Sequence, residues 1–164
     1  MKNDTKSKLD AIFQHHEAAK RIASQKQEEK ETKEQQFLRE FLDAREKIIR
    51  PAMQEVGEYV KAKGYNYEIS TEDERIPADG RSGSTDASIR LTIFTSEKNR
   101  PRHEFPGLTA YCRKRDQRIG FHSSNIAPER GGSAGPAGDA ALSEITADLI
   151  QEKLLKVVTE VFAR

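Results

Sequence analysis

Hydrophobic positions are sparse at the start of the chain. Residues 5–50 contain neither Gly nor Pro, and good helix formers dominate them, so the sequence predicts one long helix. A weak apolar seam recurs at spacings of three and four, formed by Leu9, Ile12, His16, Ala19 and Ala23. Residues 24–36 then hold no hydrophobic side chain at all. Residues 1–35 are therefore predicted to form a solvated helical extension.

Apolar positions become dense again between Phe37 and Val60. Their helical spacing predicts a helix over residues 36–63 with one broad apolar stripe, which must pack against a core. Pro51 removes one backbone donor and crowds the carbonyl four residues earlier. Two outcomes stay open there: a kink, or a break in which Pro51 opens a second helix. Gly64 is expected to end the helical region.

Beyond Gly64 the pattern changes to a period of two, which is typical of strands that bury one face. Four strands are predicted, over residues of about 65–72, 86–96, 107–115 and 117–123. None of the connections is long enough for a helical crossover, so the strands are expected to form an antiparallel meander. Residues 124–139 are rich in Gly and Pro and are predicted to be a loop.

A closing amphipathic helix is predicted over residues 140–163, with Asp139 or Thr146 as its N-cap. Together with the first apolar stripe, it offers two helical faces to cover one face of a small sheet. The predicted fold is a two-layer α+β domain over residues 36–164. It consists of the long N-terminal helix, a four-stranded antiparallel meander and the C-terminal amphipathic helix.

Composition excludes several classes of protein. The 164 residues carry 28 bases, 27 acids and one cysteine, so wholesale attraction to nucleic acid or to a membrane surface is not implied. No apolar run approaches the roughly 20 residues of a membrane span. The lone Cys112 forms neither an internal disulfide nor a zinc site. With no recognisable targeting segment, a cytoplasmic protein is expected.

Overall neutrality hides a local excess of positive charge. Residues 88–130 hold nine bases and four acids. If the odd positions of the second strand face the core, the pleat directs a basic and aromatic set of side chains to the open face of the sheet. The residues predicted to bind a partner there are Arg90, Phe94, Tyr111, Arg113, Arg118 and His122. Such a face suits either the bases and phosphates of nucleic acid or an acidic protein segment.

Candidates for catalysis lack a recognised spacing. His103 and Glu104 are adjacent, so in a strand they would point to opposite faces, and His122 is followed by two serines. Strand alternation sends Cys112 inward, as a core thiol. The segment GGSAGPAGD lacks the Lys-Ser/Thr ending of a phosphate-binding loop. No catalytic residue, metal ligand or cofactor is predicted.

The leading functional interpretation is a non-enzymatic cytoplasmic interaction or adapter protein of bacterial or phage origin. It would bind a macromolecular partner through the basic and aromatic sheet face and the mobile loops. We also expect a homodimer, because the two helical stripes offer more apolar surface than one small sheet face covers. The alternative is a nucleic-acid-binding regulator that uses the same face, and the third interpretation is a small hydrolase or nuclease without a recognisable motif.

Overall fold

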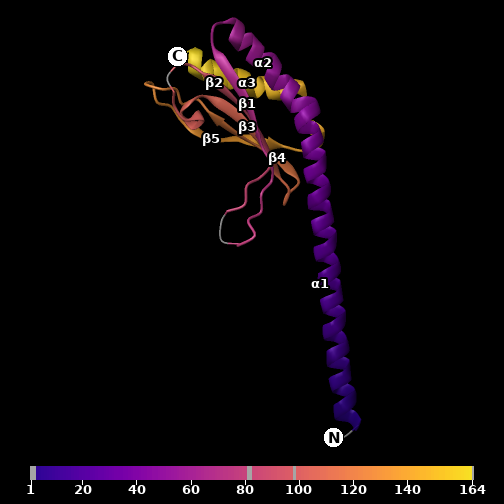
Figure 1. Ribbon diagram of the computed structural model, residues 1–164. Coiled ribbons are helices and arrows are strands. Elements are labelled where there is room, and N and C mark those ends of the chain that lie inside the picture. The colour runs from indigo at the N-terminus through magenta and orange to yellow at the C-terminus, as the bar shows by residue number, and fades with distance from the viewer. Residues whose placement is uncertain (1–2, 81–82, 98, 164) are drawn as a thin grey trace. The chain divides into compact units, whose positions relative to one another are not determined.

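The computed structural model describes residues 3–80, 83–97 and 99–163. The chain divides into two compact units, Met1–Gln36 and Phe37–Arg164. All described residues of the first unit belong to helix α1, which spans Asn3–Ala44 (Figure 1), and nearly all of them are exposed. Contacts one turn apart support this helix, such as the 2.9 Å ion pair between Lys8 and Asp4. Among the described residues, no helix combines the length and the apolar character that crossing a membrane requires.

The predicted helix over residues 36–63 is three segments in the structure. The last turns of α1 are followed by a π-helical turn, η1 (Arg45–Ile49), and then by α2 (Arg50–Ala62). Pro51 lies in the first turn of α2, directly after the π turn. Ile49 and Arg50 keep right-handed helical backbone angles, so the chain passes from η1 into α2 without the break that one of the two alternatives required. Gly64, with φ of +96°, ends the helical region as predicted.

The π turn brings the apolar positions on its two sides into line. Phe37 and Phe41 precede it, Ile49 ends it, and Ala52 and Met53 follow it, and all five are buried. A π turn rotates the chain less per residue than an α turn. An unbroken α-helix would carry the later positions away from the face of Phe37 and Phe41, whereas the wider turn keeps them on the core side.

A five-stranded antiparallel sheet follows. Its strands are β1 (Asn66–Glu72), β2 (Ser88–Phe94), β3 (Gly107–Arg113), β4 (Arg118–Ser124) and β5 (Ala134–Ala140). A short 3-10 turn, η2 (Arg102–Glu104), lies between β2 and β3. The spatial order β1-β2-β3-β4-β5 follows the chain, so the predicted meander is confirmed. The predicted number of four strands is wrong.

The fifth strand lies in the segment that was predicted to be a loop, residues 124–139. Its sequence has little strand propensity, and its register with β4 shifts between Gly120 and His122. Contacts with residues remote in sequence hold it: Asp139 pairs with Arg113 and Arg118, and Lys153 Nζ donates to the Ala137 carbonyl at 2.7 Å. Pro136 is tolerated because β5 is an edge strand.

The closing helix begins later than predicted. Instead of residues 140–163, α3 spans Ala147–Phe162, and a 3-10 turn, η3 (Leu142–Glu144), precedes it. Thr146 has an extended backbone and its Oγ1 accepts from the Leu149 N–H at 3.2 Å, so Thr146 is the N-cap. Asp139, the other predicted cap, belongs to β5 and points to the basic side chains of the sheet.

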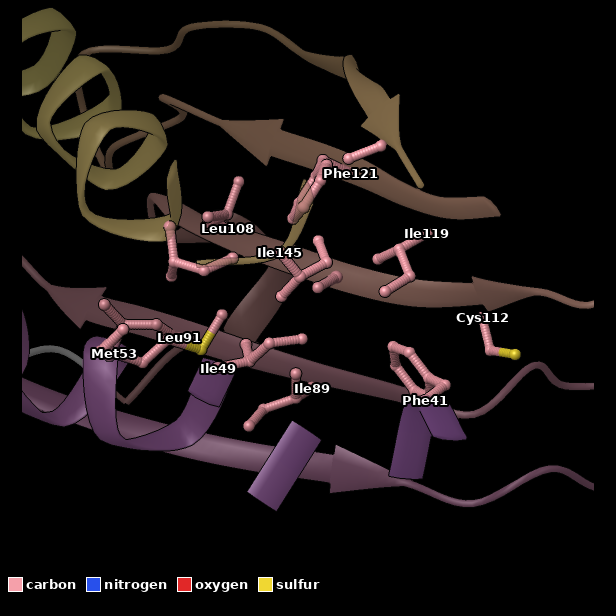
Figure 2. Close-up of a cluster of buried hydrophobic side chains, with 14 of the residues drawn as sticks. Phe41, Ile49, Met53, Ile89, Leu91, Leu108, Cys112, Ile119, Phe121 and Ile145 are labelled. Carbon is pink, nitrogen blue, oxygen red and sulfur yellow. The ribbon is translucent and has the colours of Figure 1, made fainter. Parts of the chain in front are cut away.

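Helices α2 and α3 cover the same face of the sheet, as Figure 1 shows, which makes the domain a two-layer α+β structure. Figure 2 shows Phe41, Ile49 and Met53 facing Ile89 and Leu91 of β2. All of these residues are fully buried. Cys112 of β3 belongs to the same cluster, and burial raises the pKa of its thiol to about 12, so the thiol stays protonated at neutral pH.

Candidate binding surface

The outer face is the side of the sheet that α2 and α3 leave uncovered. Strand register sets the order of its side chains in rows that run across the strands. One row is formed by Ser70, Arg90, Thr109 and His122, which pair in that sequence from β1 to β4. A neighbouring row is formed by Glu72, Ser88, Tyr111, Gly120 and Asp139, from β1 to β5.

The six residues predicted from the sequence lie on this face in three places. Arg90 and His122 share a row, with Thr109 between them. Arg113 and Arg118 are directly paired at one end of the sheet. Phe94 lies at the opposite end of the sheet. Six positions along β2 separate it from Ser88, the residue that pairs with Tyr111, and at roughly 3.3 Å per residue they span about 20 Å. The structure therefore joins the residues into two separate groups and leaves Phe94 apart from both.

Tyr111 extends along the second row. A Cβ atom on Gly120 would lie 2.3 Å from Cζ of Tyr111, so the ring rests directly over the Gly120 backbone. The contact fills the space that the missing side chain of Gly120 leaves on this face. Tyr111 thus borders the group formed by Arg113 and Arg118.

The charges of Arg113 and Arg118 are matched by acids. Nη1 of Arg113 donates to Oδ2 of Asp139 at 2.8 Å, and Nε of Arg118 donates to Oδ1 of the same carboxylate at 2.8 Å. Arg113 also pairs with Asp116 on the turn between β3 and β4. This group, which we call the Asp139 cluster, contains two bases and two acids. It does not present the excess of positive charge that the sequence predicts for this end of the face.

We expect the pKa of Asp139 to lie below its ordinary value of 3.8, mainly because Arg118 and then Arg113 donate hydrogen bonds to the charged form. The pairing therefore stabilises the fold at pH values above 3.8, and its contribution is lost as the pH falls through the lowered pKa of Asp139. A carboxyl-carbon NMR titration measures the shift. Arg118→Gln should move the pKa of Asp139 back up, whereas Arg115→Gln, on the exposed turn nearby, should leave it unchanged. An unshifted Asp139 in the wild-type protein would contradict the cluster.

Phe94 is partly covered by the connection between β2 and β3. Its ring packs against Phe105 in an edge-on arrangement, with centroids 5.0 Å apart and planes at 75°. Phe105 itself is buried, and the Ile93 N–H donates to the Pro106 carbonyl at 2.9 Å. The Pro-flanked connection is thus fixed against the end of the sheet, and the ring of Phe94 already packs against another side chain of the same domain.

Arg90 has a different environment from the other two arginines. Its half-buried guanidinium donates to Thr92 Oγ1 at 3.0 Å, to Thr109 Oγ1 at 3.2 Å and to the Phe105 carbonyl at 3.2 Å. These acceptors are all neutral, and burial lowers the pKa of Arg90. A guanidinium has five N–H donors, so two remain beyond the three hydrogen bonds. Arg90 is rigidly held, and its charge is not matched by a carboxylate among the described residues.

A groove of about 580 Å³ opens beside Arg90, between the outer face and the connection that carries η2. We call it the outer groove. Hydroxyl and basic side chains dominate its lining, which consists of Ser70, Glu72, Ser88, Arg90, Arg100, Pro101, Arg102, His103 and Thr109. Two of its bases are paired: Arg100 donates to Glu104 at 3.0 Å, and Arg102 Nε donates to Glu68 at 3.1 Å.

Sequence reasoning missed the contribution of Arg100, Arg102 and His103 to this groove. The period-two pattern places Ser70 and Thr109 on the outer face, but a Pro-flanked connection has no period from which its position follows. The net positive charge of residues 88–130 was the available signal. It indicated that basic residues gather in this part of the chain without indicating which of them meet.

The possible catalytic groups do not converge. His122 lies on the outer face, whereas the next residue, Ser123, points to the other side of the sheet, and Ser124 Oγ accepts from the Ile126 N–H at 3.2 Å. Cys112 is buried beneath the helices. Within residues 3–80, 83–97 and 99–163, no group of three or more His, Cys, Asp or Glu is placed to hold a metal ion.

Comparisons of this chain with models of protein families, with curated proteins and with solved structures gave no match. The functional argument therefore rests on the chemistry of the outer face.

Proposed function

We propose that this protein is a non-enzymatic interaction protein that holds an acidic segment of a macromolecular partner in the outer groove. The observation that carries the proposal is Arg90, whose half-buried charge has only neutral oxygen partners. A buried charge is costly unless an opposite charge and hydrogen bonds compensate it. A carboxylate from a partner would supply both, because its two oxygens match the remaining donors of a guanidinium.

The surroundings of Arg90 favour a carboxylate over a nucleic acid backbone. Glu72 lines the outer groove, and Glu68 and Glu104 pair with Arg102 and Arg100 of its lining. These acids repel the phosphates of a nucleic acid backbone, which keep a fixed spacing, more strongly than the carboxylates of a flexible peptide, whose side chains can turn away from them. Hydroxyls from Ser70, Ser88 and Thr109 offer additional donors to the same ligand.

Two further observations weaken the nucleic acid alternative. Arg113 and Arg118 already pair with Asp139, so contact with phosphates requires breaking those pairs. Phe94 packs on Phe105, which reduces the ring surface available for stacking with a base.

A cytoplasmic location remains part of the proposal, supported by the single, buried cysteine, which fits a reducing compartment.

Fluorescence anisotropy tests the proposal with a labelled octaglutamate peptide at about 50 mM salt, where screening is weak. We expect the wild-type protein to bind the peptide. Arg90→Gln should weaken binding by about 10- to 100-fold, since hydrogen bonds to charged groups are worth roughly 1.5–3 kcal/mol. Arg90→Lys, which keeps the charge but loses the planar fork, should give an intermediate loss. The matched control is Arg39→Gln, an exposed arginine of α1, which should bind like the wild type.

A labelled single-stranded oligonucleotide distinguishes the alternatives under the same conditions. If the oligonucleotide binds and displaces the peptide, the nucleic-acid-binding function replaces the proposed one. If it is cleaved when magnesium is added, a nuclease replaces it. If the peptide does not bind, or if Arg90→Gln and Arg39→Gln weaken binding equally, the role proposed for Arg90 is wrong. Circular dichroism of each variant checks that its fold is retained.

A further inference from the structure

A second groove lies on the opposite side of the domain, between α2 and α3. It has a volume of about 450 Å³, and its floor is formed by Val56, Tyr59 and Val60 of α2 with Leu155 and Val158 of α3. We call it the helix groove. Tyr59 and Leu155 are large side chains that remain 66% and 64% exposed. Each helix buries its sheet-facing residues, so these side chains belong to a second apolar surface that the sheet does not use.

The charged residues around Tyr59 are symmetrically placed. Glu55 and Lys63 lie four residues before and after Tyr59, about 6 Å along the helix axis on each side. Both are held close to the groove. Glu55 accepts a hydrogen bond from Gln151 of α3 at 2.5 Å, and the ammonium of Lys63 lies 5.2 Å from the centroid of the Tyr59 ring.

From this arrangement we infer that the occupant of the helix groove is a second copy of the same chain. In a two-fold dimer, each contact occurs twice with the roles exchanged. If two α2 helices pack antiparallel with Tyr59 at the axis, Glu55 of one copy lies opposite Lys63 of the other, and the reverse pair forms at the other end. The apolar floor is then covered by its own equivalent, and the charges at both ends are complementary.

Tyr59 and Leu155 have the properties of central interface residues. Tyrosine is enriched at interfaces because it combines a large apolar ring with a polar tip and few rotatable bonds. In the inferred dimer these two side chains contribute the buried centre of the contact, and the pairs between Glu55 and Lys63 form its rim. This inference uses the face opposite the outer groove, so it stands independently of the proposed function.

Light scattering of the full chain at tens of micromolar tests the dimer. We expect a mass about twice the 18.5 kDa of one chain. Leu155→Asp should raise the dimer dissociation constant at least about 100-fold and give a monomer, because substitutions at the buried centre of an interface cause the largest losses of binding free energy. The control is Ile76→Asp, which changes an apolar side chain that is 69% exposed outside the groove and should leave the mass unchanged.

Charge exchange tests the two-fold geometry. Glu55→Lys and Lys63→Glu each place like charges opposite one another, and each should weaken the dimer by about tenfold. The double variant Glu55→Lys with Lys63→Glu restores opposite charges and should recover most of the wild-type affinity. Failure of the double variant to recover it would overturn the antiparallel arrangement about Tyr59.

Two other results would overturn the inference as a whole. One is a wild-type protein that is monomeric at tens of micromolar. The other is a dimer that withstands Leu155→Asp but dissociates with Ile12→Asp and Phe13→Asp, two exposed apolar positions of the first unit. The second result would assign self-association to the exposed apolar side chains of α1 instead of the helix groove.

Discussion

Replacing Phe41 with alanine is expected to lower the free energy of unfolding by about 3–5 kcal/mol. Phe41 is completely buried, and its ring belongs to the cluster that joins the end of α1 to the sheet. Removing the ring loses the free energy gained when the ring is transferred from water into the core. It also leaves a cavity that the rigid sheet below it cannot fill. Urea denaturation followed by circular dichroism measures the loss as a lower midpoint with an unchanged slope.

Phe13→Ala is the matched control for this substitution. It makes the same chemical change in the same helix, but Phe13 is 63% exposed and lies in the first unit. We expect its effect on the free energy of unfolding to stay within about 0.5 kcal/mol. Equal losses from the two substitutions would contradict the assignment of the core to the second unit alone.

Gly107→Ala is expected to cost about 3 kcal/mol or more, at the upper end of the range for overpacking. A Cβ atom at this position would lie 2.3 Å from the Leu91 carbonyl oxygen and 3.0 Å from Nη2 of Arg90. The first of these atoms is backbone in the paired strand, so no side-chain rotation relieves the overlap. β2 and β3 must separate locally, and the Arg90 guanidinium must move with them.

Two measurements check this prediction. The urea midpoint should fall sharply, and any folded variant should also bind the octaglutamate peptide more weakly than the wild type, because Arg90 is displaced. Gly135→Ala in β5 is the control, since a Cβ atom there meets nothing within 4 Å. Its midpoint should be unchanged or slightly higher, as alanine restricts the unfolded chain more than glycine does. A neutral Gly107→Ala would mean that the two strands are not packed this closely.

The elements predicted best from the sequence are those whose burial is periodic. Ile89, Leu91 and Ile93 alternate with outward side chains, and all three are fully buried in β2. Such a pattern fits only a strand with one covered face, so it identifies both the strand and its orientation. The amphipathic pattern of α3 is equally direct, although its start at Ala147 depends on the extended backbone of Thr146.

The elements that the sequence did not predict depend on contacts between distant residues. β5 has a Gly- and Pro-rich sequence, and its pairing requires Asp139 to meet Arg113 and Arg118, more than 20 residues earlier. The π turn before Pro51 leaves no local signal, because its residues are ordinary helix formers. The reason for the π turn is visible only in the folded domain, where the apolar positions before and after the turn must face the same sheet.

The candidate site was predicted in part for the same reason. Alternation along the strands correctly directs Arg90 to the outer face, but it carries no information about charge pairing across strands. Whether an arginine on that face is matched depends on neighbours such as Asp139, which the sequence suggested as a helix cap instead. The position of His103 in the outer groove depends on how the Pro-flanked connection folds back, which no periodicity determines.

The strand order also has a consequence for how fast the domain folds. Each strand pairs with its neighbour in the sequence, so the sheet can assemble one hairpin at a time, with loops of no more than 15 residues to close. The packing of α3 against α2 is the exception: the hydrogen bond between Gln151 and Glu55 joins residues 96 positions apart. Contacts with large sequence separation slow folding, because chain entropy is lost before they form. The docking of the last helix is therefore the step expected to limit the folding rate, and substitutions at the α2–α3 contact should act mainly on that rate if the contact belongs to the transition state.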